Sequence, residues 1–156
     1  MLVQADRPSV IVAGSTGLVG RALLRRLTQD KHTGTVHALT RREVSDLPPS
    51  TRLLTHRVDF SERFSLPLAY ECYIALGTTI RTAGSQEAFR AVDFDAVLAV
   101  AKAAKAAGVA RLALLSALGA SPQSPVFYNR VKAEAEQAVT ELAFERLVIA
   151  RPSLLL

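Results

Sequence analysis

The chain has 156 residues and a net charge of +5, with 49% hydrophobic and 21% charged residues. This length and composition predict one globular domain over residues 1–156 and exclude a disordered chain. No apolar run approaches the about 20 residues of a membrane-spanning helix, and the first residues lack the apolar stretch of a signal peptide, so we expect no membrane partner. Cys72 is the single cysteine, which excludes an internal disulfide and favours a cytoplasmic protein.

The positive charge does not indicate a nucleic-acid partner. Basic residues are scattered, no run exceeds two, and no aromatic residues interleave with them. Nucleic-acid-binding domains instead gather lysine and arginine on one face. A solvated surface with a small anionic ligand accounts for the charge, and we expect no nucleic acid.

The predicted elements of the first half are three strands and one helix. β-branched and apolar runs predict the strands over residues 9–13, 35–40 and 53–58. Leucines at helical spacing predict a helix from Gly17 to about residue 30, and Gly34 marks its expected end. Two prolines make residues 43–50 a loop in place of a second helix.

The second half is predicted to contain three strands and two helices. The strands cover residues 70–76, 111–115 and 146–150, and a helix covers residues 128–142. A longer helix runs from the N-cap Ser85 to residue 107. Its expected buried stripe is Phe89, Val92, Ala96, Val100, Ala103 and Ala107. Apolar strands alternating with helices predict an α/β fold, a doubly wound parallel sheet (Rossmann fold) in three αβα layers.

A glycine triplet at spacing three lies between the first strand and the first helix. A tight turn there directs backbone N–H groups and the positive helix end toward one point, which suits a phosphate. The alternative is a glycine-rich turn that only caps the helix. The position at the start of the first strand–helix unit favours a dinucleotide site. Its expected residues are Gly14, Ser15, Thr16, Gly17, Leu18, Val19 and Gly20.

The second strand ends in Thr40, Arg41 and Arg42. A site for an unphosphorylated ribose would have a carboxylate there, which would repel a 2′-phosphate. Guanidinium groups bind a phosphate by charge and paired donors, so we expect NADP (NADPH) in preference to NAD. The alternative is an arginine pair that is only solvated surface.

Other strand ends supply further expected cofactor contacts. Asp59, followed by Phe60, would accept a hydrogen bond from the adenine amino group, or would only close a turn. Gly77, between Leu76 and Thr78, would let backbone pass close to the cofactor, or would be a simple turn glycine. The histidines lack metal-ligand spacing, so we expect no metal.

Tyr128 and Lys132 are four residues apart, which puts them on one face of a helix. A nearby ammonium favours the phenolate, and a phenol so poised exchanges a proton with a carbonyl or alcohol oxygen. Ser116, after the fifth strand, would hydrogen-bond the same oxygen. By itself this spacing occurs by chance in many helices, but its place in a dinucleotide fold favours a catalytic Tyr128, Lys132 and Ser116.

Together these residues resemble the atypical branch of the short-chain dehydrogenase/reductase superfamily, and within it the TIP30-like NAD(P)-binding proteins and their bacterial relatives. The narrower resemblance lies in residues 76–79, 83–93, 127–134 and 150–153. It implies an NADP-binding Rossmann fold in which Tyr128 and Lys132 are the catalytic pair and Lys132 also holds the nicotinamide ribose.

The sequence differs from the family in three places. Asp93 stands where the superfamily often has asparagine, Ala117 stands where a second serine is common, and the chain stops at Leu156 where relatives continue with a substrate-covering segment. We therefore expect an NADPH-dependent reductase of a small carbonyl substrate, with a homodimer left open. The alternatives are a non-catalytic NADP(H)-binding regulator and, less favoured, a nucleotide-sugar epimerase-like isomerase.

Overall fold

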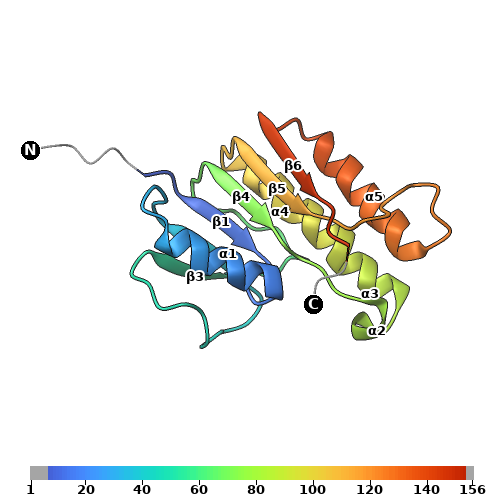
Figure 1. Cartoon of the computed structure of the whole chain (residues 1–156), viewed down its shortest axis with the longest axis horizontal. Coiled ribbons are helices and arrows are strands. Elements are labelled where there is room, and N and C mark those ends of the chain that lie inside the picture. Colours follow the sequence, from blue (N-terminus) through green and yellow to red (C-terminus); the bar gives the residue numbers. More distant parts are fainter. Residues whose placement is uncertain (1–6, 154–156) are drawn as a thin grey trace, which may run out of the picture.

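A computed structural model of the chain describes residues 7–153, in which six parallel strands form one sheet of order β3-β2-β1-β4-β5-β6 (Figure 1). The end at Leu156, where we expect a missing segment, lies outside these residues. The strands are β1 (Val10–Ala13), β2 (Val36–Thr40), β3 (Leu53–Arg57), β4 (Glu71–Ile74), β5 (Arg111–Leu115) and β6 (Arg146–Ala150). All six predicted strands are present, with ends that differ by at most two residues.

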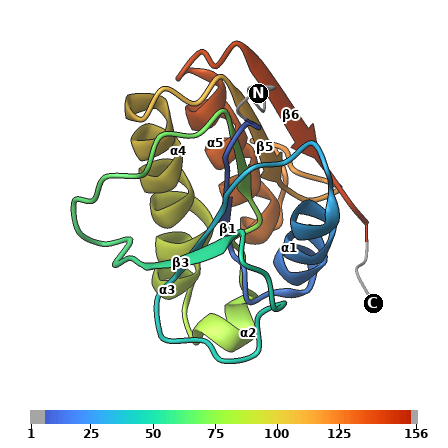
Figure 2. The same cartoon turned by 90° about the vertical axis from the view of Figure 1, so that its left-hand side faces the viewer.

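Helices cover both faces of the sheet, so the predicted three-layer α/β fold is confirmed (Figure 2). One face carries α1, and the other carries α4 and α5 (Figure 2). The helices are α1 (Leu18–Gln29), α2 (Ile80–Ala83), α3 (Gln86–Arg90), the π-helix η1 (Ala91–Ala96), α4 (Val97–Ala106) and α5 (Phe127–Thr140). None of the helices within residues 7–153 has the length and apolarity needed to span a bilayer.

The position of each strand explains its composition. β1 and β2 are buried along their whole length, because central parallel strands have helices on both sides. The edge strands β3 and β6 keep exposed positions along their length. Cys72 of β4 is fully buried, and burial raises the pKa of its thiol to about 12, so it behaves as a small apolar side chain.

The strand order reverses between β1 and β4, since the chain builds outward from β1 to β3 and then returns to the other side of β1. In open α/β sheets the loops diverge at such a point and leave a crevice beyond the carboxyl ends of the strands.

The segment predicted as one helix over residues 85–107 is α3, η1 and α4 in succession. Ser85 is the N-cap, as predicted, since its side chain accepts a hydrogen bond from the N–H of Ala88. The expected stripe is correct at Phe89, Ala96 and Val100. Within η1 the buried residue is Asp93 and not Val92, because a π-turn holds more residues than an α-turn and moves the buried face one residue along the chain. Near the end of α4 the buried residue is Ala104, four residues after Val100, and not Ala103.

Two smaller details were not predicted. The turn after β4 contains α2, a four-residue helix capped by the side chain of Thr79. Helix α1 ends at Gln29, where the sequence predicted its end. Arg52 donates to the carbonyl of Thr28 in the last turn and to those of Asp30 and Thr33 after it, so a long-range arginine satisfies the carbonyls at this end, and Gly34 lies beyond it.

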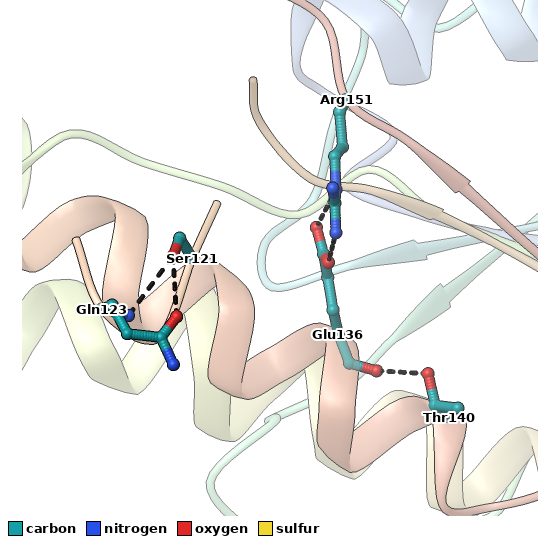
Figure 3. A network of polar contacts seen from close by, with 5 residues as sticks. All are labelled: Ser121, Gln123, Glu136, Thr140 and Arg151. Atoms are coloured by element: carbon teal, nitrogen blue, oxygen red, sulfur yellow. Dashed lines mark hydrogen bonds and ion pairs between the residues drawn. The ribbon is translucent and has the colours of Figure 1, made fainter. Parts of the chain in front are cut away.

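A half-buried ion pair ties the segment after β6 to α5. The Arg151 guanidinium donates to both oxygens of Glu136, at 2.9 and 2.5 Å (Figure 3). The Glu136 side chain is only 8% exposed, whereas that of Arg151 is half exposed. The segment that leaves β6 is thereby held against the helix that carries Tyr128 and Lys132.

Candidate functional site

A cavity of about 610 Å³ lies at the carboxyl ends of β1, β2 and β4, where the strand order reverses. Its lining includes many of the residues that the sequence pointed to, and it adds a wall from η1. The lining residues are Gly14, Ser15, Thr16, Gly17, Leu39, Thr40, Arg41, Asp59, Phe60, Ser61, Ala75, Leu76, Gly77, Ala91, Val92, Asp95 and Ala96.

The three glycines of the glycine triplet lie in different structural surroundings. Gly14 has φ +82°, and a Cβ there would lie 2.4 Å from the carbonyl of Ala75. A Cβ on Gly20 would lie 1.9 Å from the Gly14 oxygen. At Gly17 a Cβ would meet only the Gly14 oxygen, at 3.6 Å. Packing therefore demands glycine at Gly14 and Gly20, whereas at Gly17 it leaves open space beside the cavity.

The side chains of this loop hold its shape. Ser15 is buried, and its hydroxyl donates to the Leu39 carbonyl at 2.9 Å. Arg21 donates to the Thr16 carbonyl at 2.9 Å. The hydroxyl of Ser15 is thus occupied within the fold. Leu18, Val19 and Gly20 lie on α1 and are not part of the lining.

The β2 end contributes one of its two arginines to the cavity. Thr40 and Arg41 line it, whereas Arg42 does not. Asp59 also lines it, and its Oδ1 accepts from the backbone N–H and the hydroxyl of Ser61, at 2.9 and 2.6 Å. These two bonds hold the pKa of Asp59 below its usual value. Asp59 is therefore a turn residue and a cavity residue at once.

A buried ion pair lies next to the cavity, on the far side of Gly77. Lys132 Nζ is 2.6 Å from Asp93 Oδ1, and the two side chains are 7% and 0% exposed. The other oxygen, Asp93 Oδ2, accepts the backbone N–H of Thr78 at 3.0 Å. A Cβ on Gly77 would lie 3.5 Å from Asp93 Oδ1 and 3.6 Å from Lys132 Nζ. We call these two side chains the Asp93–Lys132 pair.

Burial raises the pKa of Asp93, and the adjacent Lys132 ammonium and the Thr78 N–H act in the opposite direction. Thr78 contributes to the site through its backbone and is not part of the cavity lining.

Tyr128 lies one turn before Lys132 on α5, and Ser116 directly follows β5; neither residue is part of the cavity lining. The Tyr128 ring packs on Phe89 with centroids 5.2 Å apart, and Lys132 Nζ lies 5.5 Å from the centroid of the Tyr128 ring. Ser116 is 6% exposed, and its hydroxyl is buried without a hydrogen-bond partner among the described residues. A buried hydroxyl without a partner is costly, which suits a group that bonds a ligand.

Sequence reasoning missed the wall that η1 provides. Ala91, Val92, Asp95 and Ala96 line the cavity, and Asp93 of the same turn points to Lys132. Asp93 was noticed only as a departure from a pattern. A π-turn has no local sequence signal of the kind that caps and prolines provide. The one hint in the sequence was a carboxylate, Asp93, between the apolar residues Val92 and Phe94.

Comparison with known sequences decides the family. Residues 14–153 match the family described as NAD(P)H-binding. This chain belongs to the NAD(P)H-binding family. The match begins at Gly14, the first glycine of the loop, so the predicted NAD(P)-binding Rossmann domain is confirmed.

Its relatives include fungal proteins called FMP52, mitochondrial. The chain is 36% identical over 149 residues to the protein of Eremothecium gossypii and 33% identical over 154 residues to that of Candida albicans. These alignments cover 95% of this chain and 66% and 67% of the relatives. The cytoplasmic setting that we expected from the sequence is contradicted by these names and is wrong on this comparison.

Solved structures share the fold. MoeE5 in complex with UDP-glucuronic acid and NAD superposes with a TM-score of 0.74 at 21% identity, over 92% of this chain and 54% of that one. The Bordetella bronchiseptica enzyme WbmG in complex with NAD gives 0.74 at 16% identity, over 97% and 55%. The oxidoreductase ylbE from Lactococcus lactis gives 0.72 at 21% identity, over 92% and 68%.

Proposed function

We propose that this domain binds NADP(H) and reduces a small carbonyl compound, with Tyr128 as proton donor. The observation that carries the proposal is the continuity of the site through Gly77. That glycine lines the cavity and lies next to Lys132 Nζ, which in turn lies under the Tyr128 ring. A cofactor site and an acid–base group thus meet at one strand end.

The residues present fit a phosphorylated dinucleotide. The open space at Gly17, at the N-terminus of α1, suits a pyrophosphate, because free N–H groups and the helix dipole attract anions. Arg41 suits a 2′-phosphate. Asp59 Oδ2 is the carboxylate oxygen that would accept from an adenine amino group, since Oδ1 is occupied by Ser61.

The reaction needs a hydride and a proton, and the bound dinucleotide supplies the hydride. Tyr128 donates its phenolic proton to the carbonyl oxygen as the C=O π-bond breaks, and the phenolate then regains a proton from water. Ser116 donates a hydrogen bond to the same oxygen, which gives its unpartnered hydroxyl a partner. Lys132 would also hold the nicotinamide ribose.

The narrower kinship with TIP30-like proteins of the short-chain dehydrogenase/reductase superfamily is part of this proposal. Its support is the run of residues 76–79, 83–93, 127–134 and 150–153 noted above.

The cofactor preference is tested at the two adjacent arginines. Arg41→Ala removes the guanidinium that lines the cavity, so NADPH affinity should fall about tenfold or more while NADH affinity changes little. Arg42→Ala is the matched control, since Arg42 lies outside the lining. Fluorescence titration measures both affinities. Equal losses for NADPH and NADH in Arg41→Ala would refute the phosphate role.

The reaction is tested with Tyr128→Phe, which keeps the ring that packs on Phe89. Turnover of a panel of aldehydes and ketones with NADPH should fall by at least about 100-fold, the usual share of a general acid, with NADPH affinity retained. Undiminished turnover would exclude Tyr128 as the donor.

A second candidate is a non-catalytic NADP(H)-binding regulator. The observation in its favour is that Lys132 is already paired with Asp93. Tight NADPH binding by the wild type without turnover of any carbonyl in the panel would favour this candidate.

A further inference from the structure

The Asp93–Lys132 pair changes the electrostatic effect of Lys132 on the Tyr128 phenol. An ammonium alone lowers the pKa of a nearby phenol, because its field favours the phenolate. Here the ammonium nitrogen is 5.5 Å from the Tyr128 ring centroid but 2.6 Å from a carboxylate oxygen. The phenol therefore experiences the field of an ion pair, which is much weaker than that of a free charge.

The pair is built into the fold. Asp93 is fully buried in the π-turn η1, and its second oxygen is fixed by the Thr78 N–H at 3.0 Å. Lys132 is 6% exposed on α5. Both side chains are thus almost entirely shielded from water and lie in contact with each other.

Other charged groups lie on the elements around Tyr128. Arg90 of α3 pairs with Glu134 of α5 at 2.6 Å. Arg130 keeps its charge and donates to the carbonyls of Ser124 and Pro125. Glu136 of α5 is paired with Arg151, and Asp95 of η1 lines the cavity. Lys132 is the cation whose Nζ lies against the Tyr128 ring, and Asp93 is its counter-ion.

We propose that Asp93 is a positioning residue that neutralises Lys132 and keeps the Tyr128 phenol protonated, so that the phenol serves as the acid of carbonyl reduction up to a higher pH. This inference rests on the proposed acid role of Tyr128. Reduction consumes the phenolic proton, whereas oxidation needs the phenolate as base. A chain with asparagine at position 93 would leave the ammonium uncompensated and favour the phenolate.

The test follows the phenol itself, without cofactor or substrate. The chain has three tyrosines, so subtracting the ultraviolet pH titration of Tyr128→Phe from that of the parent isolates the Tyr128 tyrosinate band. Asp93→Asn retains an oxygen for the Thr78 N–H but removes the charge. Its Tyr128 midpoint should move down by about one pH unit. Glu134→Gln, which removes an exposed carboxylate from α5, should leave the midpoint within about 0.3 unit.

A midpoint in Asp93→Asn equal to that of the wild type would overturn the proposal. Should that variant fail to fold, the double variant Asp93→Asn with Lys132→Met decides, since it buries no unpaired charge. Its midpoint should match the wild type within about 0.3 unit, because one neutral pair replaces another. A midpoint well above the wild type would show that Lys132 acts on the phenol despite Asp93, which also overturns the proposal.

The two proposals fail separately. A wild type that turns over no carbonyl would refute the reductase, yet the tyrosinate midpoints would still report on Asp93. Where turnover is found, Asp93→Asn should lose reduction at a lower pH than the wild type, and its alcohol oxidation should begin at a lower pH.

Discussion

The half of the sheet formed by β1, β2 and β3 and the half formed by β4, β5 and β6 meet at the cavity but contribute different kinds of group to it. The first half shapes it with backbone: main-chain atoms lie so close to Gly14 and Gly20 that an added Cβ would come within 3 Å of them. The second half places beside it a pair of side chains that lie far apart in sequence, Asp93 and Lys132. Backbone shape leaves a local trace in the sequence, whereas long-range side-chain pairing does not.

The largest expected effect tests the half formed by β1, β2 and β3, which shapes the cavity with backbone. Gly20→Ala would place a Cβ 1.9 Å from the Gly14 oxygen, with main-chain atoms that cannot yield. The free energy of unfolding should fall by about 3 kcal/mol, at the upper end of what overpacking costs, as measured by urea denaturation. Gly17→Ala is the matched control, and it should change stability by less than about 1 kcal/mol.

The control variant Gly17→Ala also tests NADPH binding. A methyl group at Gly17 occupies space beside the cavity, so NADPH affinity should fall about tenfold while the fold stays intact. Full NADPH affinity in Gly17→Ala would mean that this glycine only shapes the turn, which is the simpler interpretation that the sequence left open.

This contrast explains how much could be predicted. The strands, the sheet class and the glycine loop follow from local patterns, and they were predicted correctly. The ends of some elements were less accurate: β4, for example, covers Glu71–Ile74 where residues 70–76 were predicted. The π-turn was not predicted. The cavity wall around Val92 and the burial of Asp93 were therefore not predicted either.

The half formed by β4, β5 and β6 is tested at the Arg151–Glu136 ion pair, which anchors α5. Arg151→Met leaves the buried Glu136 carboxylate without its two donors, so we expect Tm to fall by about 3 °C. Arg90→Met breaks a pair whose side chains are 39% and 45% exposed, and it should shift Tm by less than about 1 °C. Equal shifts, measured by thermal denaturation, would show that burial of Glu136 adds nothing.

The smallest expected effect concerns a partly buried polar pair in the first half, which is the counterpart of the Asp93–Lys132 pair. His37 Nδ1 and His56 Nε2 are 2.8 Å apart on β2 and β3, and one of the two nitrogens donates to the other. Burial, and then the neighbouring His56, lower the pKa of His37. No ion pair of either histidine is present among residues 7–153, and the lowered pKa means that protonation of His37 opposes folding.

The sign of the pH dependence follows from that lowered pKa. Between the ordinary histidine value of about 6.5 and the lower folded value, the unfolded chain binds the proton more readily, so stability falls as the pH drops below about 6.5. Urea denaturation at pH about 7 and about 5 should show this loss in the wild type and a smaller one in His37→Gln. Carboxylates such as Asp59, whose pKa is lowered by Ser61, act below about pH 4 and lie outside this window. An identical loss in both proteins would mean that the neutral histidine pair does not set the acid limit, and that this half of the sheet tolerates a buried charge as the other half does.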